Sequence, residues 1–224
     1  MAEPRILTVP DTGAAAQAAA EMLADAIGDA LTQRGAAHIA LSGGTTPRQA
    51  FAILGPLVAH WDDVHVWFAD ERCVDPDDPE ANSRLVRETL VAPGATVHRM
   101  EGELGAEAAA EAYERALADV VLDLVLLGLG EDGHTASLFP GNPALEAEGR
   151  AAPVHDAPKP PPDRVTLTRA TIDGARARLL LVTGAGKVAA LSATLAAPDP
   201  ATPASLVRRD GLTVICDSAA AGTA

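Results

Sequence analysis

Cysteines and long apolar runs are scarce in this sequence. Cys73 and Cys216 are the only cysteines among 224 residues, which excludes a disulfide framework and favours a reducing compartment, the cytoplasm. No apolar run reaches the roughly 18 residues that a membrane span needs. The first residues also lack the basic start and apolar core of a secretory signal peptide. We therefore expect a cytoplasmic protein without a membrane partner.

Basic residues are outnumbered by acidic ones. The chain has 17 Lys and Arg against 31 Asp and Glu, which gives a formal net charge of −14. Binding to a nucleic-acid backbone needs clustered Lys and Arg, so we expect no nucleic-acid partner. A small anionic substrate remains compatible with this composition, because a few local cations are enough to bind it.

Several signatures of catalysis are missing as well. The sequence has no Gly-x-Ser-x-Gly elbow, and neither cysteine has a histidine nearby in sequence. No set of His, Cys and Asp residues has the spacing of metal ligands. Gly184-x-Gly186-Lys187 lacks the leading glycine spacing of a P-loop and its following Ser or Thr. We expect no metal and no organic cofactor.

The elements that are present alternate between strand and helix. Apolar residues make up 48% and charged residues 21% of the chain, as in globular proteins. This alternation predicts a single α/β domain over residues 1–224, with one mainly parallel sheet and helices on both faces. Strands are expected at residues 5–9, 38–41, 64–69, 122–127, 164–168, 177–182 and 212–216, and helices at about 12–34, 47–54, 81–90, 106–117 and 187–195.

The most informative stretch follows the strand at residues 122–127. Glycines end this buried strand, and Asp132 and His134 come directly after it. Ligands of open α/β sheets bind at the carboxyl ends of strands. A carboxylate can also fix the tautomer of an imidazole and raise its basicity. The pattern therefore favours His134 as a general base that Asp132 orients.

The same stretch matches a dinucleotide fingerprint, Gly128-x-Gly130-x-x-Gly133. That fingerprint requires a long helix opening on its last glycines, whereas Pro140 limits any helix here to about two turns. Glu131 and Asp132 would also repel a pyrophosphate. The match therefore does not predict nucleotide binding.

Two further strand ends carry polar residues. Ser42-Gly-Gly-Thr-Thr-Pro47 lies between a strand and a helix, where free backbone N–H groups can cradle a phosphate; an ordinary tight turn would leave the same pattern. Asp70-Glu71-Arg72 is either a solvated loop or the source of an arginine for a carboxylate, phosphate or oxyanion. Asn82 lies at the start of the next predicted helix.

These motifs, taken in order, resemble the glucosamine-6-phosphate isomerase/6-phosphogluconolactonase family. The resemblance covers about residues 6–216, and its most specific part is the run from Asp132 to Pro140. It implies the α/β fold shared with glucosamine-6-phosphate deaminase and ribose-5-phosphate isomerase. Within the family, the chain looks like the lactonases, which hydrolyse 6-phospho-D-glucono-1,5-lactone in the oxidative pentose phosphate pathway without a metal or organic cofactor. The other motifs that carry the resemblance are Ser42-Gly-Gly-Thr-Thr-Pro47, Asp70-Glu-Arg72, Pro162-x-Arg164-Val-Thr-Leu-Thr168 and Gly184-x-Gly-Lys187.

The resemblance also implies a role for each site residue. His134 would activate water against the lactone carbonyl, Asp132 would orient His134, and Arg72 would hold the substrate or its oxyanion. Asp70, Glu71 and Asn82 are further candidates without an assigned role. The substrate phosphate would bind to Ser42, Gly43, Gly44, Thr45, Arg164 and Lys187.

Two alternatives stay open. The deaminases of the family share the phosphate cradle and the Gly-x-Asp-Gly-His core, but they continue with Ile-Ala-Phe-Asn-Glu-Pro where this chain has Thr-Ala-Ser-Leu-Phe-Pro. They carry Tyr where this chain has Arg72, and Asp70 matches their proton-abstracting Asp. The second alternative is a non-catalytic sugar-phosphate sensor on the same fold. The presence of His134 argues against it.

Overall fold

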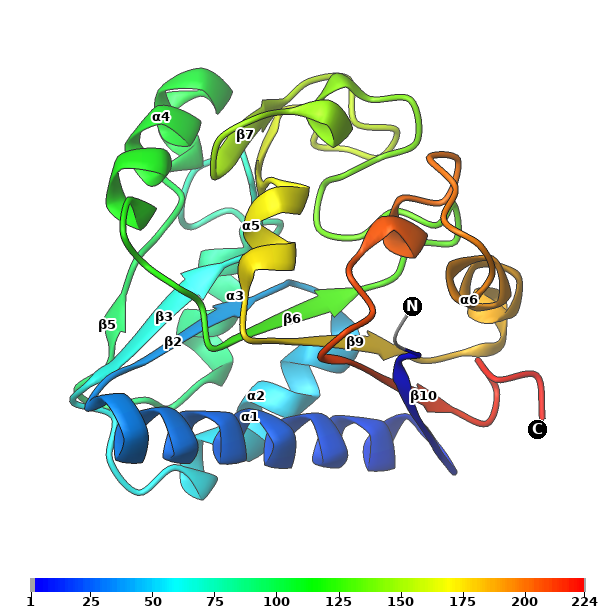
Figure 1. Cartoon of the computed structure of the whole chain (residues 1–224). Helices are drawn as coiled ribbons and strands as arrows, with labels where there is room; N and C mark the ends of the chain where they lie inside the picture. The colour runs from blue at the N-terminus through cyan, green and yellow to red at the C-terminus, as the bar shows by residue number, and fades with distance from the viewer. Residues whose placement is uncertain (1–2, 224) are drawn as a thin grey trace.

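The computed structural model of the chain describes residues 3–223 and is built on a seven-stranded parallel sheet. All six pairings between neighbouring strands are parallel. Figure 1 shows the arrows of β6, β9 and β10 ending on the same side of the molecule, beside α6. The spatial order is β1 (Arg5–Val9), β10 (Leu212–Asp217), β9 (Ala177–Val182), β6 (Leu124–Gly128), β2 (Ala37–Leu41), β3 (Val64–Phe68) and β5 (Thr96–Val97).

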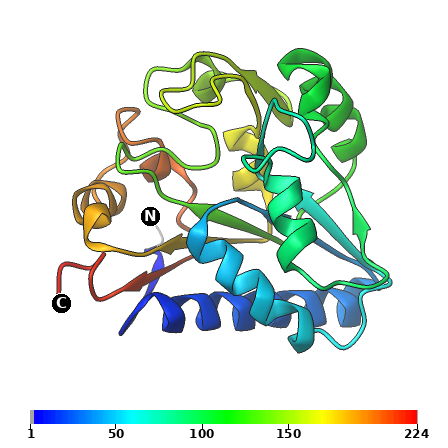
Figure 2. The ribbon, with the colours of Figure 1, turned by 180° about the vertical axis from the view of Figure 1, so that it is seen from behind.

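Helices cover both faces of this sheet, as the alternating pattern predicts. Figure 1 shows α1 (Thr12–Arg34) and α2 (Thr45–Leu57) below the sheet and α5 (Arg169–Gly174) above it. In Figure 2, α2 lies beside α3 (Asn82–Thr89), and the two are in contact. The remaining helices are α4 (Ala106–Leu117), α6 (Val188–Leu195) and the short 3-10 turns η1 (Gly102–Leu104), η2 (Pro143–Glu146), η3 (Ala185–Lys187) and η4 (Pro203–Leu206).

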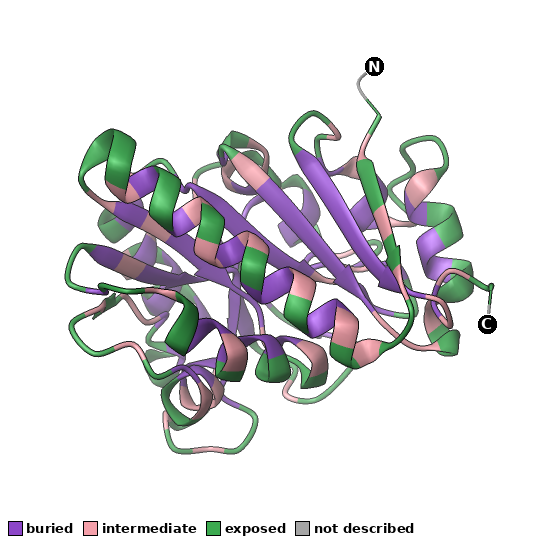
Figure 3. Cartoon of the chain, turned by 90° about the horizontal axis from the view of Figure 1, so that it is seen from below, coloured by how far each residue is buried: buried purple, intermediate pink, exposed green. Residues whose placement is uncertain are grey.

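The longest helix, α1, begins and ends where the sequence predicts. The Asp11 side chain accepts a hydrogen bond from the Ala14 N–H and caps the helix, and Gly35 ends it in a left-handed conformation. Figure 3 shows a buried stripe along the helix, on the side that packs against the buried strands. Small residues dominate that stripe, so α1 lies close to the sheet: Ala15, Ala16, Ala19, Ala20, Leu23, Ile27 and Ala30.

A second, three-stranded antiparallel sheet was not expected. It consists of β4 (Asp70–Arg72), β8 (Arg164–Leu167) and β7 (Ala151–Val154), in that order. The strand predicted at residues 164–168 therefore lies outside the parallel sheet, and the Asp70–Arg72 segment is itself a strand. No helix separates β7 from β8, so the two pair as antiparallel neighbours.

Ala69 connects the two sheets. Its N–H donates to the Leu41 carbonyl at the end of β2 (2.8 Å), and its carbonyl accepts from the Leu167 N–H in β8 (2.8 Å). The small sheet is thereby fixed at the carboxyl edge of the large one. Among residues 3–223, none of the helices is long and apolar enough to cross a membrane.

Candidate active site

A cavity of about 390 Å³ lies at the carboxyl edge of the parallel sheet. Loops that follow β2, β6 and β9 contribute to it, as do β4 and β8 of the small sheet. Four basic and two acidic side chains line the cavity, so it is locally cationic in a chain of net charge −14. The charged lining residues are Arg72, Lys159, Arg164, Lys187, Asp70 and Glu80.

His134 and Asp132 form a hydrogen-bonded pair in the loop after β6. The bond joins Nδ1 of the imidazole to Oδ1 of the carboxylate. Only 17% of the His134 side chain is exposed, against 36% for Asp132. The His134 ring packs against Phe139, with the centroids 4.4 Å apart. Among residues 3–223 no hydrogen-bond partner engages Nε2, which leaves this nitrogen available to a substrate or water in the cavity.

The environment of His134 favours a neutral imidazole. Burial lowers the pKa of His134 below its usual value of 6.5, while the hydrogen bond and charge of Asp132 act to raise it. Asp70 also acts to raise this pKa, and the positive charge of Lys159 acts to lower it. An imidazole with a lowered pKa is unprotonated near neutral pH, which is the form that a general base requires.

The loop that carries the pair is held by its own hydrogen bonds. Gly130 N–H donates to the His134 carbonyl (2.8 Å), and the Thr135 hydroxyl donates to the Gly128 carbonyl (2.8 Å). A Cβ atom on Gly130 would overlap Nδ1 of His134 and Oδ1 of Asp132. The glycine is therefore required for close approach of the pair. No α-helix follows β6 here, in agreement with rejection of the dinucleotide fingerprint.

The segment between β2 and α2 presents free backbone donors. Gly44 is the N-cap of α2, and no side chain caps that helix. Among residues 3–223 no acceptor is recorded for the N–H groups of Gly43, Gly44 and Thr45, and Gly43 and Gly44 line the cavity. The Ser42 hydroxyl donates to the Leu126 carbonyl (2.9 Å), so it is not free to donate to a ligand. Free backbone N–H groups at a helix N-terminus are suited to bind an anion.

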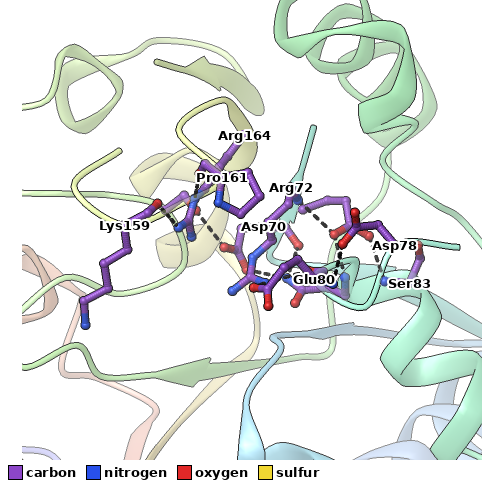
Figure 4. Close-up of polar contacts among 11 residues, drawn as sticks. Asp70, Arg72, Asp78, Glu80, Ser83, Lys159, Pro161 and Arg164 are labelled. Carbon is purple, nitrogen blue, oxygen red and sulfur yellow. Dashed lines mark hydrogen bonds and ion pairs between the residues drawn. The ribbon is translucent and has the colours of Figure 1, made fainter. Parts of the chain in front are cut away.

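Two arginines from paired strands face the same cavity. Arg72 in β4 lies opposite Arg164 in β8. Arg72 Nη1 donates to the Glu80 carbonyl (2.6 Å) and contacts its carboxylate at 3.4 Å. Arg164 is only 4% exposed, lies 5.4 Å from the Phe139 ring centroid, and has its pKa lowered by burial and by the charge of Arg72. Figure 4 shows these side chains together with Asp70 and Lys159.

The buried Asp70 carboxylate is already satisfied by protein donors. Its Oδ2 accepts from the Ser137 hydroxyl (2.7 Å), and its Oδ1 accepts from the Asn82 amide (3.2 Å). The Asn82 amide oxygen in turn lies against Gly43, where a Cβ atom would overlap it. Asn82 therefore fixes Asp70 and the phosphate-cradle segment relative to each other.

Glu71 has a structural position away from the cavity. Its carboxylate accepts from the N–H groups of Asn82 (2.6 Å), Ser83 (2.7 Å) and Arg72 (2.8 Å), and it thereby caps α3, which has no capping side chain of its own. Burial raises the pKa of Glu71, and these N–H bonds act to lower it. Glu71 holds the start of α3 in place and so positions Asn82.

Most of the chain matches a known protein family. The sequence model of the family "Glucosamine-6-phosphate isomerases/6-phosphogluconolactonase" matches residues 10–215. The chain belongs to this family. A 6-phosphogluconolactonase of Mycobacterium tuberculosis is 40% identical over 214 residues, covering 85% of each chain. A 6-phosphogluconolactonase of Rattus norvegicus is 39% identical over 210 residues, covering 84% of this chain and 80% of the relative.

Solved structures of the family have the same fold. A 6-phosphogluconolactonase from Shewanella baltica superposes with a TM-score of 0.87 at 29% identity, covering 96% of this chain and 98% of the other. A monomeric glucosamine-6-phosphate deaminase superposes with a TM-score of 0.85 at 21% identity, which supports the shared fold alone. The mainly parallel sheet with helices on both faces is therefore confirmed as the fold of this family member.

Most of the residues singled out from the family motifs lie at one place. The cavity is lined by eight of them: Ser42, Gly43, Gly44, Asp70, Arg72, His134, Arg164 and Lys187. Thr45, Glu71, Asn82 and Asp132 do not line it, although Asp132 and Asn82 each hold a residue that does. Sequence reasoning missed Glu80, Ser137, Phe139 and Lys159. Ser137 and Phe139 belong to the most specific motif and could have been inferred from it, whereas Glu80 and Lys159 lie in loops with no distinguishing pattern.

Proposed function

We propose that this family member hydrolyses 6-phospho-D-glucono-1,5-lactone to 6-phosphogluconate, with His134 as the general base. The observation that carries the proposal is the His134–Asp132 pair. It leaves Nε2 of His134 available in a cavity that four basic side chains and the backbone of Gly43 and Gly44 also line. The 6-phosphogluconolactonases at 39–40% identity support the choice of substrate.

The proposed chemistry needs only water and a base. Nε2 of His134 takes a proton from a water molecule as the water oxygen attacks the lactone carbonyl carbon. The carbonyl electron pair moves onto oxygen and returns as the bond to the ring oxygen breaks, and His134 then gives its proton to that leaving oxygen. General-base catalysis of this kind contributes roughly 10²–10⁴ in rate. Asp132 stabilises the imidazolium that forms between the two proton transfers.

The phosphate of the substrate would bind away from the reacting carbon. Backbone N–H groups of Gly43, Gly44 and Thr45, with Lys187 and Arg164, form the proposed phosphate site. Ser42 contributes through its backbone, because its hydroxyl is engaged by the Leu126 carbonyl. Binding energy from the phosphate would hold the lactone carbonyl beside His134. Arg72, the register partner of Arg164 across β4 and β8, would contact the sugar or the carbonyl oxygen.

The state of Asp70 favours hydrolysis over deamination. An isomerase needs this carboxylate as a proton acceptor, but here the Ser137 hydroxyl and the Asn82 amide occupy both oxygens. The deaminase motif has Phe at the position of Ser137, which would leave the aspartate without this donor. We therefore propose that Asp70 orders the site and supplies negative charge near His134.

We also propose a cytoplasmic enzyme that acts without a metal or organic cofactor and has no nucleic-acid partner. Cys73 and Cys216 are unpaired, which supports a reducing compartment. Burial raises the pKa of the Cys73 thiol to about 11, so it is not an activated nucleophile.

The substrate assignment is tested with three compounds and the purified protein. We expect faster opening of the phosphorylated lactone than of glucono-1,5-lactone, and no ammonia release from glucosamine 6-phosphate. Lys187→Ala should raise KM for the phosphorylated lactone with a smaller effect on kcat, and Arg115→Ala, an exposed residue on α4, serves as the control. Equal rates on both lactones would refute the phosphate site. Ammonia release without lactone opening would support the deaminase alternative, and phosphogluconate binding without any turnover would support the sensor.

A further inference from the structure

Lys159 lies in a loop between β7 and β8 whose backbone is tied to the buried Arg164. The Arg164 Nη2 group donates to the Lys159 carbonyl (2.8 Å), and its Nε group donates to the Pro161 carbonyl (3.0 Å). The Ala157 N–H donates to the Pro162 carbonyl (2.9 Å) and closes the loop on itself. The main chain of Lys159 is therefore placed by a side chain that is itself part of the cavity wall.

The two ends of this loop are held by contacts with α4 and with the segment that follows β4. His155 Nε2 lies 2.7 Å from Glu107 Oε1 in α4, and its Nδ1 lies 2.8 Å from Asp163 Oδ1. These two carboxylates raise the pKa of His155 and favour its charged form. The Cys73 N–H donates to the Asp163 carbonyl (2.9 Å) next to β4. The loop thus has a defined position above the cavity.

The Lys159 ammonium group is not engaged by another side chain. Among residues 3–223 it forms no ion pair or hydrogen bond, whereas Arg72 is tied to Glu80. Figure 4 shows the Lys159 side chain extending away from the Arg164 guanidinium group. Lys159 is also the one basic residue among the groups that shift the pKa of His134. Lys159 and His134 line the same cavity, so the ammonium group is available to a substrate that lies beside the proposed base.

We propose that Lys159 stabilises the lactone carbonyl oxygen as it becomes negatively charged, and then holds the carboxylate of the product. This inference rests on the proposed lactone hydrolysis. A water molecule activated by His134 must lie beside the carbonyl carbon, so the developing charge falls within the field of the Lys159 ammonium group. Lys187 in η3 also lines the cavity. The hydroxyl of Thr183, just before η3, lies 2.6 Å from the hydroxyl of Thr46 in α2, which brings this segment to the start of α2, where the phosphate site is proposed. The two lysines would thus bind opposite ends of one substrate.

The test compares Lys159→Gln with Lys187→Gln in lactone hydrolysis. We expect Lys159→Gln to lower kcat by about 10²-fold, because removal of one oxyanion-stabilising group costs roughly 10²–10³ in kcat. Lys187→Gln should instead act mainly on KM. Lys159→Arg, which keeps the positive charge, should recover part of the lost kcat. Thermal unfolding of all three variants checks that the loop and the fold are retained.

Two further measurements separate this role from a merely structural one. The positive charge of Lys159 lowers the pKa of His134, so Lys159→Gln should move the acid limb of the kcat/KM profile to higher pH. Inhibition by 6-phosphogluconate should weaken in Lys159→Gln, while inhibition by glucitol 6-phosphate, which has no carboxylate, should not.

The outcomes show whether Lys159 acts on the carbonyl end or on the phosphate end of the substrate. If Lys159→Gln raises KM alone and weakens both inhibitors equally, Lys159 binds the phosphate and the proposal is wrong. An unchanged variant in the presence of an active wild-type enzyme also overturns it. A wild-type enzyme that does not open the lactone refutes the proposed function itself, and with it the role given to Lys159.

Discussion

Gly130 lies directly against the imidazole of His134, and a Cβ atom at that position would overlap Nδ1 of the ring. The contact explains why a glycine precedes the Asp132–His134 pair. We predict that Gly130→Ala displaces His134 and lowers kcat by about 10²-fold, since a 1 Å displacement of a reacting group has effects of this order. Steady-state kinetics on the phosphorylated lactone measure the change.

Gly28→Ala is the matched control for this substitution. A Cβ atom on Gly28 in α1 meets no atom within 4 Å, and Ala is the better helix former. We expect unchanged kinetics and equal or slightly higher stability. A Gly130→Ala enzyme as active as Gly28→Ala would show that the position of His134 does not limit the reaction.

The pH dependence of the reaction should report the lowered pKa of His134. In the proposed mechanism the neutral imidazole is the active form, so we expect kcat/KM to fall as the pH decreases through a pKa below 6.5. Asp132 acts to raise that pKa, and Asp132→Asn should therefore move the acid limb to lower pH and also reduce kcat. A pH profile of both enzymes tests this. An acid limb that moves upward in Asp132→Asn would contradict the pairing of the two side chains.

Glu71 should matter for stability more than for chemistry. Its carboxylate accepts two backbone N–H groups at the start of α3 and the N–H of Arg72 in β4, and Gln cannot accept all three. We predict that Glu71→Gln lowers the free energy of unfolding by about 1–3 kcal/mol, the usual loss for a buried hydrogen bond to a charged group. Urea unfolding measures it, with Glu21→Gln on the exposed face of α1 as the control. A stable Glu71→Gln protein with no lactonase activity would assign Glu71 to the chemistry instead.

A histidine cluster outside the cavity lining should make stability depend on pH. Trp67 Nε1 donates to His38 Nδ1 (3.1 Å), and His65 Nδ1 lies 2.9 Å from His98 Nε2. Burial, followed by the charge of His65, lowers the pKa of both His38 and His98. The unfolded chain therefore binds protons more readily, and stability decreases as the pH falls below 6.5 toward the lowered values.

Urea unfolding at a series of pH values between about 5 and 7.5 tests this cluster. His98→Gln removes one titrating group and should flatten the dependence, whereas His60→Gln, an exposed residue, should leave it unchanged. Equal slopes for the wild type and His98→Gln would contradict the prediction.

Local sequence signals predicted the large sheet and the ends of α1. Apolar runs such as β6 fit strands that are covered on both faces, and Asp11 and Gly35 bound the helix as capping residues do. The small sheet could not be inferred in this way, because the pattern of β8 is the same whether it pairs with parallel or antiparallel neighbours. β7 also contains Pro153, which cannot donate to a strand ladder and so weakens the local signal for a strand.

The candidate site also contains both residues that local motifs mark and residues that only long-range contacts bring there. His134, Asp132 and the Gly43–Gly44 turn lie within motifs, so their position at one site could be predicted from the sequence. Lys159 lies in a proline-rich loop whose place beside the cavity depends on long-range contacts, among them the hydrogen bond from Arg164 to the Lys159 carbonyl. The satisfied state of Asp70 likewise depends on a long-range contact with Ser137, which no local pattern encodes.

The central claim, that His134 activates water for lactone opening, is tested most directly by the kcat of His134→Gln. Hydrolysis of the phosphorylated lactone would be followed by proton release, and binding of 6-phosphogluconate would be measured in parallel. We predict that kcat falls by about 10²-fold or more while binding and unfolding are retained. A His134→Gln enzyme that turns over at a rate close to wild type would remove His134 from the mechanism.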